Sequence, residues 1–348
     1  MFKPKYTITP KINLSLTEIE RVRGFLDAVK IKESWFHKLQ KEALLEESHY
    51  STHIEGTNIT LNQARKIFAG KKVYGVSIDV QKELKNYRSA MNFVSKYLGK
   101  EDPITEGLIR EMHKILVKDV RGNKADPGSY RKIQNYIVNS VTREVIYTPP
   151  SAADVPIMMR ELVEWLNNIS KDTSPVIVSG VTQFQFEHIH PFLDGNGRTG
   201  RLLSTLILYK TGYDFKRLFK LSEFYDKDHT FYYQALQSVR KNSMDMTAWL
   251  DYFTYGLKTQ MIEVKKKGEK IIKRESILEN IDKSKFNERQ IKALEYMVKN
   301  ERINVNEYQK ITNCIRRTAQ RDLVDLVNKN ILKEVSKSPT DPTKYYEF

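Results

Sequence analysis

The sequence has very little cysteine and no long hydrophobic run. Its 348 residues include one cysteine, Cys314, which excludes an internal disulfide and a zinc site built from several cysteines. No apolar run approaches the roughly 18 residues of a membrane-spanning helix, and no apolar segment of signal-peptide length follows Met1. We therefore expect a cytoplasmic protein without a membrane partner. The chain is 40% hydrophobic and 29% charged, a composition typical of folded globular domains.

Acidic residues are also in short supply relative to basic ones. The chain has 58 Lys and Arg residues and 43 Asp and Glu residues, which gives a net charge of +15. The imbalance is densest from residue 256 onward, where 21 basic residues accompany 14 acidic ones. Such an excess favours a polyanionic partner, either nucleotide phosphates, a nucleic acid or an acidic protein surface.

Hydrophobic periodicity predicts a mainly helical chain in four segments. Apolar residues recur every three to four positions in an N-terminal helical region, residues 1–100, and in a core with its following helices, residues 101–255. A charged connecting helix is expected over residues 256–284, followed by a separate domain over 285–348. Within the core, residues 136–138 and 145–147 predict a short β-hairpin, with Asn139 and Ser140 in its turn.

The last segment has the order of a winged helix-turn-helix domain. Helical patterns at residues 287–298, 304–311 and 315–329 precede two strand-like stretches at 331–335 and 344–348. The third helix resembles the recognition helix of winged-helix regulators. Arg316, Arg317, Gln320 and Arg321 lie near its start, where such a helix contacts DNA bases and phosphates. Winged helices also dock proteins, so a protein partner is the alternative.

The segment from residue 188 to residue 201, HIHPFLDGNGRTGR, carries the strongest chemical signal. Gly195 and Gly197 allow backbone conformations in which successive amides converge on an anion. The helix that follows adds the partial positive charge of its N-terminus. Arg198 and Arg201 are three residues apart, so both guanidinium groups can reach the same phosphates. The pattern therefore predicts a site for nucleotide phosphates.

Two further residues of this segment complete a reactive site. Asp194 offers a hard oxygen ligand that suits Mg²⁺, and a neutral His190 could accept a proton from an attacking hydroxyl. Gly195, Gly197 and Gly200 also satisfy the G-x-G-x-x-G pattern of dinucleotide-binding folds. No β-strand leads into them and no alternating β-α pattern surrounds them, so that interpretation is not favoured.

The run from His190 to Arg201 resembles the signature H-P-F-x-[DE]-G-N-G-R-x-x-R of the Fic family, and every specified position matches. The resemblance implies a mainly α fold: a Fic-type helical core with a short β-hairpin flap, here with the C-terminal winged helix-turn-helix domain added. It also implies a protein adenylyltransferase that uses ATP and Mg²⁺ to place AMP on a Ser, Thr or Tyr hydroxyl of a protein.

The resemblance assigns roles to individual residues. His190 would be the general base, and Asp194 would hold the Mg²⁺ ion. Val145, Ile146 and Tyr147 would belong to the flap that docks the target segment by strand addition. The residues expected to bind ATP are Gly195, Asn196, Gly197, Arg198, Thr199, Gly200, Arg201 and the aromatic pair Tyr232 and Tyr233. For that aromatic pair, packing in a helix core is the alternative.

A second motif lies near the N-terminus. The stretch that contains Ser51, Glu55 and Gly56 resembles the inhibitory [ST]-x-x-x-E-[GN] motif of the family subclass with N-terminal inhibition. A carboxylate delivered to Arg201 would form a bidentate pair and take the charge meant for the γ-phosphate. An ordinary capped helix turn is the alternative explanation for so short a pattern. In some relatives that remove AMP, the equivalent of Glu55 positions water.

Other functions remain open on the sequence alone. The chain could be a DNA-binding regulator whose Fic-like core senses nucleotide. It could also remove AMP, or transfer another nucleotidyl or phosphoryl group, on the same scaffold. The sequence does not name the protein substrate, and the chain itself is among the candidates. It does not fix the oligomeric state, for which a homodimer is one option.

Overall fold

The computed structural model describes residues 2–29, 33–97, 102–120, 126–138, 142, 144–169, 172–338 and 341–348. The described chain forms two compact units. The N-terminal unit holds residues 2–29 and Phe36–Val264, and the C-terminal unit holds Lys265–Phe348 together with residues 33–35 at the start of α2. The division falls inside one long helix, α11 (Thr247–Asn280), which therefore contributes to both units.

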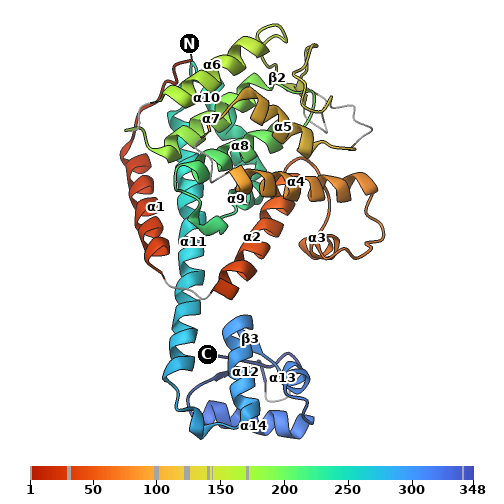
Figure 1. Ribbon diagram of the computed structural model, residues 1–348, viewed down its shortest axis with the longest axis vertical. Coiled ribbons are helices and arrows are strands. Elements are labelled where there is room, and N and C mark those ends of the chain that lie inside the picture. Colours follow the sequence, from red (N-terminus) through yellow and green to blue (C-terminus); the bar gives the residue numbers. More distant parts are fainter. Residues whose placement is uncertain are drawn as a thin grey trace. The chain divides into compact units, whose positions relative to one another are not determined.

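Helices dominate the N-terminal unit, so the prediction of a mainly helical fold is confirmed (Figure 1). Its other helices are α1 (Pro10–Ala28), α2 (Glu33–His53), α3 (Leu61–Phe68), α4 (Ile78–Lys96), α5 (Glu106–Leu116), α6 (Val155–Asn168), α7 (Pro175–Ile189), α8 (Asn196–Lys210), α9 (Leu221–Lys227) and α10 (His229–Lys241). Capping residues fix several of the starts. Thr9, Thr60, Ser77 and Thr105 each accept a backbone N–H of the first turn through the side chain.

Helices α7 and α8 lie in the middle of this unit, with α5, α6 and α10 around them (Figure 1). Both are buried along almost their whole length, which explains why their sequences lack the polar face of a surface helix. Phe184 of α7 and Leu206 of α8 belong to one hydrophobic core, and Ser179 hydrogen bonds Ser204 across the interface at 2.7 Å. The motif segment connects these two helices and is therefore anchored at the centre of the core.

The predicted hairpin is present. Strands β1 (Ile137–Val138) and β2 (Val145–Tyr147) pair antiparallel, with Ile137 opposite Tyr147. The predicted turn residues Asn139 and Ser140 lie outside the described residues. Val138, Val145 and Ile146 are exposed apolar side chains on this small sheet.

The C-terminal unit combines three helices with a three-stranded antiparallel sheet. Its elements after α11 are the 3₁₀ turn Lys283–Lys285, α12 (Glu288–Asn300), β3 (Arg302–Ile303), α13 (Val305–Thr312), α14 (Arg316–Asn328), β4 (Lys333–Val335) and β5 (Tyr345–Glu347). The strand order is β3-β5-β4. Leu294, Tyr308, Leu323 and Tyr346 form part of a core of their own. Strand β3 was not expected, because two residues are too few to show an alternating pattern.

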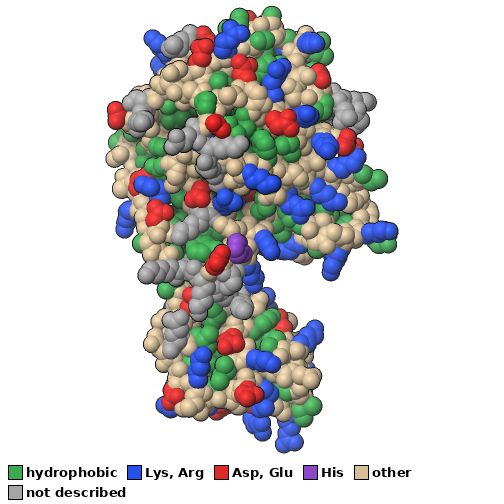
Figure 2. All heavy atoms as spheres, in the orientation of Figure 1, with side chains coloured by type: hydrophobic (Ala, Val, Ile, Leu, Met, Phe, Trp, Pro, Cys, Tyr) green, Lys and Arg blue, Asp and Glu red, His purple; other side chains and the backbone are tan. Residues whose placement is uncertain are grey.

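Charged side chains cover both units. Lys and Arg side chains lie scattered over the visible face, with Asp and Glu side chains among them (Figure 2). Among the described residues, no helix is both long enough and apolar enough to cross a membrane.

Candidate active site

The motif segment turns sharply between α7 and α8 because two residues adopt the left-handed conformation. His190 ends α7 with φ 51°, and Gly195 precedes α8 with φ 78°. At Gly195 a side chain would be strained by this φ, and its Cβ would lie only 2.9 Å from Val117 Cγ1. The glycine is therefore required both by the turn and by the close approach of α5.

The side chain of Asn196 closes this turn. Its amide oxygen accepts the Phe192 N–H and its amide nitrogen donates to the Phe192 carbonyl, both at 2.8 Å. The first N–H group bonded within α8 belongs to Thr199, which donates to Gly195. The amides of Asn196, Gly197 and Arg198 therefore fall in the first turn of α8, where N–H groups have no partner inside the helix. A helix start of this kind suits the binding of an anion, which the sequence predicts here.

A histidine that sequence reasoning missed contacts the turn between α7 and α8. His113 of α5 stacks on Phe192 with ring centroids 3.7 Å apart. The Gly128 N–H donates to His113 Nδ1, so Nε2 carries the proton and donates to the Asp194 carbonyl at 2.9 Å. Burial lowers the pKa of His113 to about 4, which keeps the ring neutral in this role. Nothing in the local sequence around His113 indicates this contact.

The buried guanidinium group of Arg198 lies near two carboxylates of the site. Its guanidinium lies 3.7 Å from Glu83 and 3.5 Å from Asp194. Its Nε and Nη1 atoms are buried and make no hydrogen bond within the described part of the chain. Buried donors without acceptors are rare in proteins, so these atoms are suited to a phosphate oxygen.

Asp194 is the candidate ligand for Mg²⁺. One carboxylate oxygen accepts the Gly195 N–H at 2.6 Å, and about a third of the side chain is exposed. Mg²⁺ commonly binds through one or two carboxylates together with substrate phosphates and water. A partly exposed carboxylate beside an anion-binding turn fits that chemistry.

The second motif binds Arg201, but Glu55 does so through one oxygen and not as the bidentate pair expected from the sequence. Its Nε donates to Ser51 Oγ at 2.9 Å, and its Nη2 donates to the Ser51 carbonyl and to Glu55 Oε1, both at 2.8 Å. The Glu55 carboxylate also lies directly against Gly197, where a Cβ would collide with Oε1. The structure thus brings together two motifs that are 146 residues apart and places a carboxylate where the phosphates are expected to bind.

His190 sits beside this charged centre. Burial lowers its pKa to about 4, so the imidazole is neutral at physiological pH and can accept a proton. Arg131, which sequence reasoning did not single out, fixes the backbone here by donating from Nε to the His190 carbonyl at 2.9 Å. The buried carboxyl of Glu187 lies 3.9 Å from His190 Nδ1, and burial raises its pKa to about 7.

The flap is tied to α7 through one tyrosine. Tyr147 of β2 hydrogen bonds His188, with its hydroxyl 2.7 Å from Nδ1, and Arg240 covers the face of the Tyr147 ring at 3.4 Å. Tyr147 is therefore an anchor for the hairpin, while Val145 and Ile146 are exposed.

The remaining residues expected to bind ATP are not all in the turn. The Thr199 hydroxyl donates to the Gly195 carbonyl, and Gly200 packs against Phe186 and Glu187 of α7. Tyr232 is 1% exposed and stacks on Tyr225 with ring centroids 4.5 Å apart. Its neighbour Tyr233 is 44% exposed.

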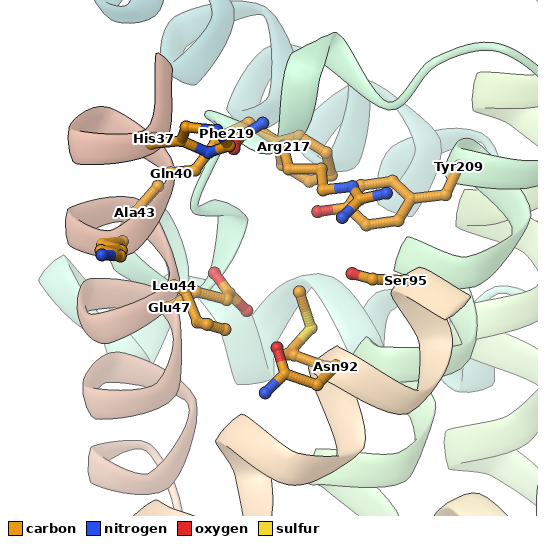
Figure 3. A pocket seen from close by; sticks show the side chains of 12 residues that line it. His37, Gln40, Ala43, Leu44, Glu47, Asn92, Ser95, Tyr209, Arg217 and Phe219 are labelled. Carbon is orange, nitrogen blue, oxygen red and sulfur yellow. The ribbon is translucent and has the colours of Figure 1, made fainter. Parts of the chain in front are cut away.

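Besides this site, a cavity opens where α2 and α4 meet the end of α8 (Figure 3). Glu47, Asn92, Ser95, Tyr209 and Arg217 are among the side chains that line it, and none of its lining residues belongs to the two motifs. The Glu47 carboxylate accepts the Ser222 N–H at 3.0 Å and a hydrogen bond from Tyr87. The cavity is therefore a separate feature of the same unit.

The arginines of the C-terminal unit are placed differently. Arg316, Arg317, Gln320 and Arg321 all lie in the first turns of α14 and are exposed. Ala319 and Leu323 of the same helix face the core, as expected from the sequence.

Comparison with known proteins agrees with the geometry of the core. Residues 103–208 match the model of the Fic/DOC family. The chain is 32% identical over 200 residues to proteins named protein adenylyltransferase Fic from Drosophila willistoni and Drosophila virilis. The matched region covers 57% of this chain but only 38% and 39% of those relatives, so the chain spans well under half of their length.

Solved structures show the same fold. A Fic family protein from Desulfovibrio desulfuricans G20 aligns over 100% of this chain and 98% of its own, with a TM-score of 0.69 and 23% identity. A Fic domain containing signaling protein from Bacteroides thetaiotaomicron VPI-5482 aligns over 74% of this chain and 97% of its own, with a TM-score of 0.62 and 24% identity. The chain therefore carries a Fic domain at residues 103–208.

Proposed function

We propose that this protein transfers AMP from ATP to a Ser, Thr or Tyr hydroxyl of a protein, and that Glu55 holds the site in an inhibited state. The observation that carries the proposal is the turn and helix start of residues 190–201, which contain a neutral histidine, the N–H groups of the first turn of α8 and two buried arginines. The likeness to curated protein adenylyltransferases over 200 residues supports the same activity.

The residues supply what attack at a phosphorus atom requires. His190 accepts the proton of the target hydroxyl, whose oxygen then bonds to the α-phosphorus. The bond from that phosphorus to the oxygen bridging to the β-phosphate breaks, and pyrophosphate leaves. Arg198 and the amides of Asn196 and Gly197 stabilise the phosphate charges. Asp194 would hold Mg²⁺, which supplies further neutralisation of those charges when bound.

The ion pair between Glu55 and Arg201 opposes this reaction. Arg201 cannot contact a γ-phosphate while all of its described hydrogen bonds go to Ser51 and Glu55. The Glu55 carboxylate would also repel phosphate oxygens at Gly197, because like charges in a buried site interact strongly. Removal of this carboxylate is therefore expected to admit ATP in a reactive position.

The activity is tested by following each phosphate separately. The Glu55→Gly protein is incubated with a protein mixture and ATP labelled at either the α- or the γ-phosphate. We expect the target protein to receive label only from ATP labelled at the α-phosphate. Its mass should increase by that of AMP on a Ser, Thr or Tyr residue. Transfer of γ-label would indicate a phosphoryl transferase, and absence of both labels from target proteins and from the chain itself would refute the proposal.

We propose further that the C-terminal unit is a winged helix that binds DNA. The exposed Arg316, Arg317 and Arg321 at the start of α14, together with the adjoining antiparallel sheet, support this second function. A gel-shift assay with duplex DNA at low and high salt tests it. Binding that weakens steeply with salt is expected, and no binding at low salt would refute it.

A further inference from the structure

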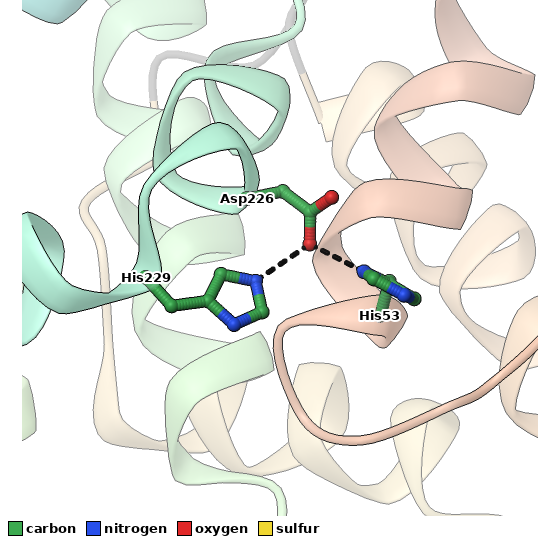
Figure 4. Close-up of side chains that lie close together, drawn as sticks. All are labelled: His53, Asp226 and His229. Atoms are coloured by element: carbon green, nitrogen blue, oxygen red, sulfur yellow. Dashed lines mark hydrogen bonds and ion pairs between the residues drawn. The ribbon is translucent and has the colours of Figure 1, made fainter.

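Three side chains meet beside the turn that carries Glu55. His53 ends α2, Asp226 lies near the end of α9, and His229 begins α10. One carboxylate oxygen of Asp226 lies 2.6 Å from His53 Nδ1 and 2.8 Å from His229 Nε2 (Figure 4). Both imidazoles therefore converge on the same point from different helices.

The spacing of these atoms suits a metal ion. The two imidazole nitrogens and the carboxylate oxygen all lie within 4.8 Å of one another. Zn²⁺ binds nitrogen and oxygen ligands at about 2.0–2.2 Å, which puts neighbouring ligand atoms about 3.3 Å apart. Modest side-chain rotations would bring the three atoms to that separation. The two histidines are more than a third exposed, so an ion could enter from solvent and keep bound water.

A buried histidine next to the cluster provides a second observation. His49 lies one turn before His53 on α2, is only 6% exposed, and stacks on the His53 ring with centroids 5.7 Å apart. Its Nδ1 atom is buried and has no hydrogen-bond partner among the described residues. Buried polar atoms without partners are uncommon, and they often mark the place of an ion or an ordered water.

We propose that His53, Asp226 and His229 bind a divalent transition-metal ion with the chemistry of Zn²⁺. The buried ring of His49 lies beside His53 and supports this site. Two imidazoles and one carboxylate suit Zn²⁺, whereas Mg²⁺ prefers oxygen ligands alone. The site therefore differs in metal preference from the single carboxylate of Asp194.

The position of the site gives the ion a consequence for activity, and this consequence rests on the proposed function. The ion would join the end of α2 to α9 and α10 only two residues before Glu55. The turn after α2 is closed by a hydrogen bond from the Gly56 N–H to the His53 carbonyl at 2.9 Å. An ion that fixes His53 would therefore oppose the movement that releases Arg201 from Glu55.

Zinc binding is tested directly on the full chain without a histidine tag. Zn²⁺ is titrated against a chromophoric chelator, with excess Mg²⁺ present and no ATP. We expect one Zn²⁺ per chain, and at least about tenfold weaker binding by His229→Gln and by the nearly isosteric Asp226→Asn. His37→Gln, which removes a histidine outside the cluster, is the matched control and should bind as the wild type does.

Two results would contradict the metal site. Equal zinc affinity in wild type, His229→Gln and Asp226→Asn would refute the site, as would the lack of any zinc binding by the wild type. Thermal unfolding without metal identifies a variant that fails to fold, and two different substitutions guard against that case. If the buried ring of His49 contributes to the site, His49→Gln should also lower the zinc affinity, but by less than His229→Gln and Asp226→Asn do.

A transfer assay then separates the two proposals. Zn²⁺ should slow AMP transfer by the wild type and leave His229→Gln and Glu55→Gly unaffected. Slowing of all three proteins alike would refute the inhibitory consequence while leaving the measured binding site intact. If no protein transfers AMP but zinc binding follows the expected order, the proposed function fails and the metal site stands.

Discussion

The arginines that we expect to meet polyanions are held in opposite ways in the two units. In the N-terminal unit, Arg201 is 3% exposed, and its described hydrogen bonds end on Ser51 and Glu55 of the same chain. In the C-terminal unit, the side chain of Arg321 is 74% exposed, and Arg316 and Arg317 are exposed with it at the start of α14.

This difference separates two ways of meeting a polyanion. A buried arginine is already oriented and desolvated, so a single internal carboxylate can neutralise it, and loss of that carboxylate changes the site sharply. An exposed arginine is screened by salt and contributes to binding gradually, one phosphate at a time. The net charge of +15 alone does not distinguish these roles.

The largest effect is expected at the buried site. In a Glu55→Gly background, His190→Ala should lower the rate of AMP transfer by about 10²–10⁴-fold, because it removes the imidazole that accepts the proton of the target hydroxyl. Incorporation of label from α-labelled ATP measures the rate. His37→Ala in the same background is the control, and it should retain the full rate. A His190→Ala protein that transfers AMP at an undiminished rate would contradict the role of the histidine.

A smaller and salt-dependent effect is expected in the C-terminal unit. The double variant Arg317→Ala/Arg321→Ala should bind duplex DNA about ten- to a hundredfold more weakly at low salt. The slope of log affinity against log salt concentration should become shallower by about 0.9 for each phosphate that the variant no longer neutralises. AMP transfer should be unchanged. Arg21→Ala, at an exposed position of α1, is the matched control and should bind DNA as the wild type does. If Arg21→Ala binds DNA as weakly as the double variant, α14 has no special role in DNA binding.

The smallest effect concerns stability at the buried site. Burial raises the pKa of Glu187 from 4.5 to about 7, so between these values the folded chain keeps a proton that the unfolded chain has lost. The stability that the Glu187 carboxyl contributes to the folded chain is fully present below pH 4.5, and it is lost as the pH rises through 7. Glu187→Gln should remove this pH-dependent loss of stability and raise the free energy of unfolding by about 3 kcal/mol at pH 8.

Urea unfolding from pH 5 to pH 8 measures this difference, which should grow across the range. Thr182→Val, at a buried position of the same helix that does not ionise, is the control and should show no such growth. A constant difference between Glu187→Gln and wild type at every pH would contradict the raised pKa.

Local signals in the sequence predicted much of this molecule. Asn287 caps a helix that begins where the pattern places it, because the side chain of a capping residue acts on the next three residues. The motif of residues 190–201 predicted a helix start after its first glycine, and α8 begins at Asn196. The pairing of Glu55 with Arg201 was predicted through the family resemblance, and the two side chains do meet.

Contacts between distant segments that no family motif indicates were beyond sequence reasoning. His113, Arg131 and Glu83 each support the motif from another element, through interactions with Asp194, His190 and Arg198. An isolated histidine, arginine or glutamate carries no pattern that names its partner. The cluster of His53 with Asp226 and His229 is hidden in the same way, since 173 residues separate His53 from Asp226.

The central claim is that Glu55 restrains an otherwise complete transfer site. The most direct measurement compares AMP transfer by wild type, Glu55→Gly and Glu55→Gln at equal protein and ATP concentrations. Both variants should be faster than wild type by about tenfold or more, because each removes the charge that neutralises Arg201. Equal rates in all three proteins, with each folded and able to bind ATP, would contradict the claim.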